Sequence, residues 1–168
     1  MDNIIICGLD PSQETGYAIL ETQPNLRVMD TGVIQAEKMA CKGESLSKYG
    51  LLLQEVFGLY KPTFIVCEDL NYTRNLRTVK SLAKLQGIIE MEGWIYNDCP
   101  VSFFTATEAR KKIGVKGSAT KEEVAKYLKE YFKSDTDVDW KDTNITDALA
   151  IALAMWKTIV KETKEVSQ

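Results

Sequence analysis

The sequence predicts an α/β fold in which one five-stranded mixed sheet is flanked by helices. Three short β-type segments joined by tight turns open the chain, two further strands alternate with helical segments, and three helical segments close it. We find neither an internal repeat nor a low-complexity linker, so residues 1–168 are expected to form a single domain.

The first three predicted strands form an antiparallel meander. The apolar, β-branched segment 3–9 (NIIICGL) is stopped by an Asp-Pro pair, and a second strand, 16–22 (GYAILET), follows a turn. The third strand, 27–36 (RVMDTGVIQA), is reached through a Pro-Asn turn. Such short connections favour antiparallel pairing, because a parallel pair needs a long crossover.

The next segments alternate between helix and strand. Residues 44–60 have helical periodicity, and residues 63–70 (TFIVCEDL) are typical of a buried strand in a parallel sheet. A long helix is expected over roughly 74–97, followed by a short strand at 101–104 (VSFF). These two later strands are expected to be the parallel part of the sheet.

Capping signals mark the remaining helices. The T-x-x-E capping boxes at 105–108 and 120–123 predict helices that reach about residues 112 and 132. The final helix is expected to start near residue 143, with Thr143 or Asp142 as its cap, and to run past residue 156. The tail after residue 161 is expected to be frayed.

Composition limits the possible chemistry. The chain has no histidine, which excludes Ser-His-Asp and Cys-His catalysis, HExxH metalloproteases and imidazole-based zinc sites. The four cysteines lack CxxC spacing and are predicted to be buried free thiols: Cys7, Cys41, Cys67 and Cys99. Hydrolysis would therefore use carboxylates, lysines or a hard metal ion held by oxygen atoms.

The sequence also predicts a cytoplasmic protein. No apolar run approaches the ~20 residues of a membrane span. The start of the chain lacks the basic region of a signal peptide. No membrane partner is therefore expected.

Three acidic residues are predicted to converge at one edge of the sheet. Asp10 ends the first strand, Glu68 ends the fourth, and Asp147 opens the last helix directly before an apolar run. If strands one and four are parallel neighbours, the carboxyl ends of both lie where α/β sheets bind ligands. Asn144 lies three residues before Asp147, on the same helix face.

Such a cluster predicts a divalent metal site. Crowded carboxylates repel one another unless cations occupy the site, and Mg²⁺ or Mn²⁺ prefers oxygen ligands. Two such ions about 3.5–4 Å apart can drive phosphodiester hydrolysis. Each acid alone also has a structural explanation: Asp10 as a turn former, Glu68 as a solvated strand end, and Asp147 as a favourable charge at a helix N-terminus.

The net charge of −3 argues against a nucleic-acid partner, but the basic residues are unevenly distributed. The segment 71–89 has no acid and places four basic residues within about 120° of a helix, behind one stacking aromatic. The aromatic is Tyr72 and the four basic residues are Arg74, Arg77, Lys80 and Lys84. The segment 110–133 has eight basic residues, among them Arg110, Lys116 and Lys121. Each segment is predicted to contact DNA, with a solvated surface as the alternative.

The segment 85–96 (LQGIIEMEGWIY) has more large apolar residues than one buried helix face requires. Gly87 and Gly93 would let a second helix approach closely. Two readings stay open at this point, a homodimer interface and burial within the monomer.

Four segments resemble the RuvC-type Holliday-junction resolvases of the ribonuclease H-like superfamily. They are IIICGLDPSQETGYAIL, FIVCEDL, VKGSATKEEVAKYL and NITDALAIALA, and the resemblance spans about residues 4–156. It implies a ribonuclease H-like fold, a homodimer, and Mg²⁺-dependent nicking of Holliday junctions and other branched DNA. It also implies that Asp10, Glu68 and Asp147 bind metal, that Lys121 lies near the scissile phosphate, and that Arg110 contacts DNA.

Two positions depart from the family pattern. Asn144 stands where the family has Asp or His, and the aromatic after Glu68 is shifted by one residue, to Tyr72. The predicted site has two ions, bridged by Asp10 and completed by Glu68 and Asp147, with Asn144 assisting. The alternatives are a non-catalytic binder of branched DNA and a ribonuclease H acting on RNA–DNA hybrids. Because no partner-docking segment is recognisable, the sequence favours an independently acting and phage-borne enzyme.

Overall fold

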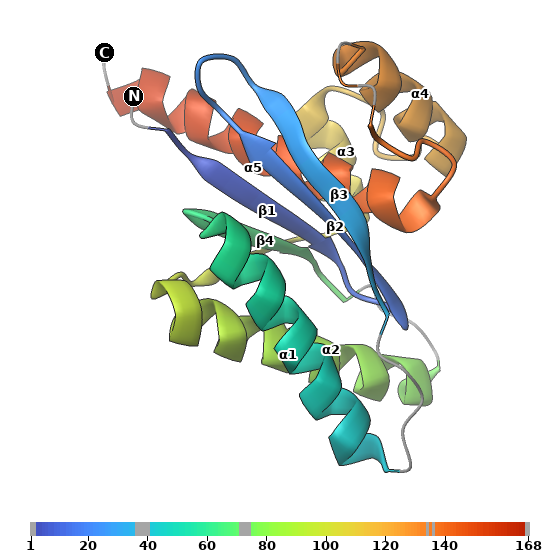
Figure 1. The fold of residues 1–168 in the computed structure, drawn as a ribbon. Helices are drawn as coiled ribbons and strands as arrows, with labels where there is room; N and C mark the ends of the chain where they lie inside the picture. The colour runs from blue at the N-terminus through green and yellow to red at the C-terminus, as the bar shows by residue number, and fades with distance from the viewer. Residues whose placement is uncertain (1–2, 36–40, 71–74, 134, 136, 167–168) are drawn as a thin grey trace.

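The computed structural model describes residues 3–35, 41–70, 75–133, 135 and 137–166, which form a sheet covered by helices on both faces (Figure 1). The strands are β1 (Ile5–Asp10), β2 (Glu14–Glu21), β3 (Arg27–Gln35), β4 (Phe64–Glu68) and β5 (Val101–Phe104). The helices are α1 (Lys42–Tyr60), α2 (Leu76–Asn97), α3 (Ala106–Ile113), α4 (Lys121–Tyr131) and α5 (Thr143–Val166).

The strand order is β3-β2-β1-β4-β5, which confirms the predicted five-stranded mixed sheet. Strands β3, β2 and β1 form the antiparallel meander. Strand β4 pairs in parallel with both β1 and β5. The predicted parallel neighbours, strands one and four, are therefore adjacent, and their carboxyl ends lie at the same edge.

Helices α1 and α2 cover one face of the sheet, and α3, α4 and α5 cover the other (Figure 1). Side chains of the central strands alternate between these layers: Ile6 and Val66 pack on the α5 side, and Cys7 and Ile65 on the α1–α2 side. Burial on both faces explains why β1 and β4 are continuous apolar runs.

Helix α5 lies unusually close to the sheet because glycines face it. A Cβ on Gly8 of β1 would lie 2.3 Å from the carbonyl oxygen of Ala148, and a Cβ on Gly16 of β2 would lie 2.1 Å from that of Asn144. The helix itself is alanine-rich where it contacts the sheet, and both Ala148 and Ala152 are fully buried. This contact brings the first turns of α5 against the strand ends.

The helix starts follow the capping signals. Both predicted capping boxes are formed, at Thr105 with Glu108 and at Thr120 with Glu123. Asp142 caps α5, because its Oδ1 accepts hydrogen bonds from the N–H groups of Asn144 (2.8 Å) and Ile145 (3.4 Å). Of the two proposed caps, Asp142 is thus the one used.

One prediction about the ends of helices is wrong and one is confirmed. As far as the tail after Lys161 is described, it is not frayed, since α5 continues to Val166 and an ion pair between Lys161 and Glu165 (3.7 Å) spans its last turns. Helix α2 (Leu76–Asn97) agrees with the helix expected over roughly 74–97, and the side chain of Asn75 caps it.

The cysteine prediction needs one correction. All four cysteines are free, and Cys7, Cys67 and Cys99 are buried. Cys41 is exposed, because it lies at the start of α1, where its thiol accepts a hydrogen bond from the N–H of Glu44 (3.4 Å). In the described part of the chain, no helix combines the length and the apolar character that crossing a bilayer requires.

Candidate active site

The two strand-end acids lie side by side. Pairing of β1 with β4 ends at Leu9 and Cys67, so Asp10 and Glu68 are the next residues at the same edge. Leu9 faces the α1–α2 layer, and the alternation along a strand therefore turns Asp10 to the α5 side. Asp147, in the second turn of α5, lies close enough for its charge to act on both of the other carboxylates.

The cluster is costly to ionise. Burial, and then the charge of Asp147, raise the pKa of Asp10 to about 6, against the lowering effect of Lys121. Burial, followed by the charges of Asp10 and Asp147, raises the pKa of Glu68 to about 7, against Lys121 and Arg110. The charges of the three acids, Lys121 and Arg110 thus act on one another and set the pKa values of Asp10 and Glu68 together.

A cation of the chain itself contacts the cluster. Lys121, the first residue of α4, places its Nζ 2.5 Å from Oδ2 of Asp147. Burial lowers the pKa of Lys121, but the hydrogen bond to Asp147 and the three carboxylate charges outweigh it, so the pKa is raised overall. The side chain of Asp147 is 13% exposed and that of Lys121 is 50% exposed, so water screens this ion pair from the side of the lysine.

The donor set suits a hard divalent ion, although it is not a closed cage. Carboxylate oxygens from three elements, with the Asn144 amide one turn before Asp147, are the ligand types that Mg²⁺ and Mn²⁺ prefer. Among the described residues, no three acidic or cysteine side chains converge closely enough to form a ready metal site. The oxygen atoms would therefore have to move together on binding, and Asp147 would exchange its ammonium partner.

The turn after Asp10 is braced by a network that the sequence analysis missed. The Thr15 hydroxyl donates to the carbonyl oxygen of Ser12 (3.0 Å) and accepts from the Ser12 N–H (3.2 Å). The hydroxyls of Thr15 and Tyr49, both buried, lie 3.1 Å apart. The two hydroxyl partners are 34 residues apart, so no local pattern in the sequence indicates this network.

The predicted DNA-contacting residues fall into three groups. Tyr72 and Arg74 lie outside the described residues. The remaining α2 residues, Arg77, Lys80 and Lys84, are exposed, as is Lys116 before α4. Arg110 is half-buried, and its charge lowers the pKa of Glu68, so it belongs to the carboxylate cluster as well as to the surface.

The segment 85–96 is apolar on two faces. Ile89 and Gly93 are buried, and Gly93 packs on Ile65 and Val101 of the same chain rather than leaving room for a second helix. Helices α1 and α2 also expose large apolar side chains to solvent: Leu51, Leu59, Met91, Trp94 and Ile95. The buried face of this segment thus fits burial within the monomer, and its exposed apolar residues fit a homodimer interface.

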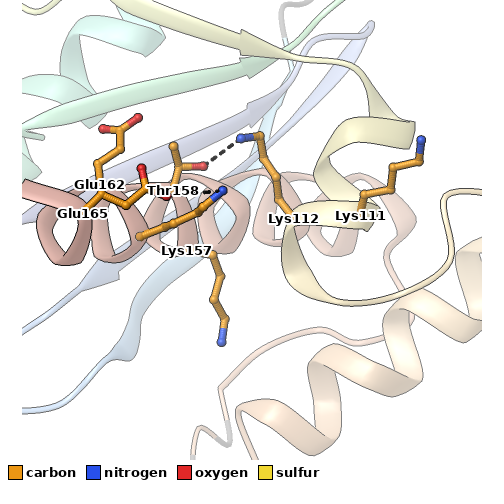
Figure 2. A pocket seen from close by; sticks show the side chains of 7 residues that line it. Lys111, Lys112, Lys157, Thr158, Glu162 and Glu165 are labelled. Atoms are coloured by element: carbon orange, nitrogen blue, oxygen red, sulfur yellow. Dashed lines mark hydrogen bonds and ion pairs between the residues drawn. The ribbon is translucent and has the colours of Figure 1, made fainter.

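A hollow of about 480 Å³ lies between α3 and α5 (Figure 2). It is lined by Lys111, Lys112, Lys157, Thr158, Lys161, Glu162 and Glu165. Lys112 donates to the Thr158 hydroxyl (3.0 Å) and lies 4.6 Å from the centre of the Phe104 ring. The hollow holds none of the predicted site residues, and Lys157 is ten residues beyond Asp147, roughly 15 Å along the helix.

Comparison with known proteins identifies the family of the chain. Residues 6–155 match the family model described as crossover junction endodeoxyribonuclease RuvC. The chain belongs to the RuvC family. It is 28% identical over 153 residues to the RuvC of Dictyoglomus thermophilum, which covers 90% of this chain and 95% of that relative.

Solved resolvase structures share the RuvC fold. Thermus thermophilus RuvC in complex with a Holliday junction substrate superposes with a TM-score of 0.80 at 17% identity, over 94% of this chain and 96% of that one. The yeast mitochondrial Holliday junction resolvase gives a TM-score of 0.69 at 11% identity, over 96% and 82%. The predicted ribonuclease H-like architecture is therefore confirmed.

Proposed function

We propose that this RuvC-family chain is an endonuclease that nicks Holliday junctions and other branched DNA by metal-dependent hydrolysis of a phosphodiester bond. One observation carries the proposal: Asp10 and Glu68 follow the last paired residues of the neighbouring strands β1 and β4, and the charges of Asp147 and Lys121 act on both carboxyl groups. Buried acids with raised pKa values beside basic residues are more typical of a catalytic site than of a binding surface. The RuvC name of its relatives supports the choice of substrate.

The metal ligands in this proposal are Asp10, Glu68 and Asp147, with Asn144 as a neutral fourth ligand. Asp10 would be shared by two ions, Mg²⁺ by preference and Mn²⁺ as a substitute. The chemistry that bound divalent ions would supply there is activation of a water molecule and stabilisation of the leaving 3′ oxygen, giving a 5′-phosphate and a 3′-hydroxyl. The buried helix and the strand ends hold the ligands on rigid elements.

The chain's own cations act on the DNA phosphate. Lys121, whose Nζ contacts Asp147, would neutralise the charge that builds up on the scissile phosphate. Arg110, next to Glu68, would hold an adjoining phosphate. The exposed basic face of α2 would follow the DNA backbone with Arg77, Lys80 and Lys84.

We also propose that the enzyme acts as a homodimer through the outer face of α1 and α2. Leu59 is 72% exposed, and Trp94 and Ile95 are each 61% exposed on this face. Large apolar side chains grouped in this way are typical of a protein interface. A two-fold dimer would present two active sites to the two strands of a junction.

One set of assays tests this function. The purified chain is incubated with labelled four-way, three-way and RNA–DNA hybrid substrates in Mg²⁺ or Mn²⁺, beside the Asp10→Asn variant. We expect nicking of branched DNA by the wild type, and binding without nicking by the variant. Binding without nicking by the wild type would indicate a non-catalytic binder, and preferential cutting of the hybrid would indicate a ribonuclease H. Nicking by Asp10→Asn would overturn the site assignment.

A further inference from the structure

Gln86 of α2 is buried beneath the candidate active site and is used by none of the steps above. It is 8% exposed, and it shares the inner face of its helix with Ile89. Its Nε2 donates a hydrogen bond of 2.9 Å to the backbone carbonyl oxygen of Glu68. A buried amide that reaches the backbone of a candidate metal ligand from a different layer calls for an explanation.

The strand geometry supplies that explanation. The peptide between Glu68 and Asp69 is trans, and its N–H donates to the carbonyl oxygen of Phe104 on the β5 side (2.9 Å). The Glu68 carbonyl therefore points away from β5, toward the side on which β1 lies. There β1 runs into Pro11, which has no N–H to continue the ladder. Gln86 provides a side-chain donor where the neighbouring strand cannot provide a backbone one, beside a longer contact from the Cys67 thiol (3.4 Å).

We propose that Gln86 is a positioning residue of the nuclease: it fixes the last peptide of β4 and thereby holds the Glu68 carboxylate at the spacing that the divalent ions require. This inference rests on the proposed function. Gln86 does not contact substrate or metal and acts through Glu68. Residues that orient a metal ligand from behind typically change metal affinity or activity by about 10–100-fold when they are replaced.

The chain offers a matched control in Gln54 of α1. Its Nε2 also donates one hydrogen bond, of 3.0 Å, to an oxygen of a residue on α2, in this case Oε2 of Glu92. Glu92 is buried between α1 and α2 and is not part of the carboxylate cluster. Replacing Gln54 therefore removes a hydrogen bond of similar length from the same helical layer without touching β4.

The experiment compares the wild type, Gln86→Met and Gln54→Met, because methionine keeps the length of glutamine but cannot donate. The readouts are the affinity for Mn²⁺ without DNA, junction binding without metal, the kcat for nicking, and the midpoint of thermal unfolding. We expect Gln86→Met to bind Mn²⁺ about tenfold more weakly and to have a lower kcat, with junction binding unchanged. Gln54→Met should match the wild type in Mn²⁺ affinity and kcat.

The outcomes separate the two proposals. A purely structural role for Gln86 predicts a lower unfolding midpoint with wild-type Mn²⁺ affinity, and that result would overturn the inference while leaving the function intact. A wild-type chain that neither binds Mn²⁺ nor cuts junctions would overturn the proposed function and this inference together. If Gln86→Met fails to fold, Gln86→Glu, which places an acceptor opposite the carbonyl, is expected to weaken Mn²⁺ binding in the same way.

Discussion

The Nζ of Lys121 lies 2.5 Å from Oδ2 of Asp147, so a candidate metal ligand is paired with a cation of the chain itself. The ammonium offsets part of the negative charge that Asp10, Glu68 and Asp147 bring together. An incoming divalent ion must compete with it for Asp147. Lys121 is therefore expected to influence two quantities in opposite directions, the affinity for metal and the rate of cleavage.

Replacing Lys121 with methionine should tighten metal binding and slow cleavage. A half-exposed ion pair is worth about 1 kcal/mol, which corresponds to about fivefold in Mg²⁺ or Mn²⁺ affinity. Loss of a cation at the phosphate should lower kcat by about 10²–10³-fold. Calorimetric titration with Mn²⁺ and single-turnover nicking measure the two effects. Lys126→Met, at an exposed lysine of the same helix, is the control, and weaker Mn²⁺ binding by Lys121→Met would contradict this account.

The raised pKa values of Asp10 and Glu68 predict a cost in stability for the metal-free protein. Each carboxyl keeps its proton to a higher pH when folded, so the folded state binds more protons than the unfolded chain between about pH 4 and the folded values of about 6 and 7. The contribution of these groups to the free energy of unfolding therefore falls as pH rises through this window. Below pH 4 the cost is absent.

The variant Asp10→Asn isolates this effect. At pH 7.5 without metal it should be more stable than the wild type by about 1–2 kcal/mol, and the difference should vanish near pH 4. Denaturant unfolding at several pH values measures it, and Mg²⁺ should stabilise only the wild type. A stability difference that does not depend on pH would argue against charge repulsion as the cause.

Gly16→Ala should separate the acids without changing any of them. A Cβ at this position would lie 2.1 Å from the Asn144 carbonyl oxygen, so the start of α5 would have to leave the sheet and carry Asp147 with it. We expect a loss of about 1–3 kcal/mol in stability and a loss of nicking. The control is Gly58→Ala on α1, where nothing lies within 4 Å of the new Cβ. This variant should gain about 0.5–1 kcal/mol and retain activity.

The exposed α1–α2 face predicts how the dimer can be dissociated. A charge at Ile95, which is 61% exposed, should convert a dimer into a folded monomer, because an unpaired lysine would be buried in the interface. Light scattering after size exclusion measures the mass. A cooperative unfolding transition of Ile95→Lys would show that the monomer is folded. Leu76→Lys is the control on the same helix, at a site that is 69% exposed and lies outside the proposed interface. A wild-type chain that is already monomeric at micromolar concentration would refute the interface.

Asn144→Asp tests the departure from the family pattern. A carboxylate one turn before Asp147 would add charge to the metal site, so Mg²⁺ should bind more tightly and nicking should be faster at low Mg²⁺. The added acid also suits the N-terminal turn of α5, so the fold should tolerate it. Titrating nicking against Mg²⁺ gives the comparison. Identical curves for the two chains would mean that Asn144 only shapes the helix start.

The sequence by itself determined the secondary structure and the residue types at the ends of its strands and helices. Each strand and helix follows from short-range patterns: apolar β-branched runs for β1 and β4, and T-x-x-E caps for α3 and α4. The positions of Asp10 and Glu68 at strand ends follow from the same patterns, since a run of apolar residues must stop where the chain leaves the core. The parallel pairing of β1 and β4 was only a condition of the predicted site, and the strand order of the folded sheet decided it.

Contacts between distant segments were decided by the tertiary structure alone. Lys121 meets Asp147, Thr15 meets Tyr49, and Gln86 meets the Glu68 carbonyl because packing sets the distance between layers, and no local pattern encodes that distance. The approach of α5 depends on Gly8 and Gly16 facing it across the sheet, which is a property of the assembled core. The sequence thus specifies which acids can form the site, and the packing of α4 and α5 on the sheet determines which cation lies against them.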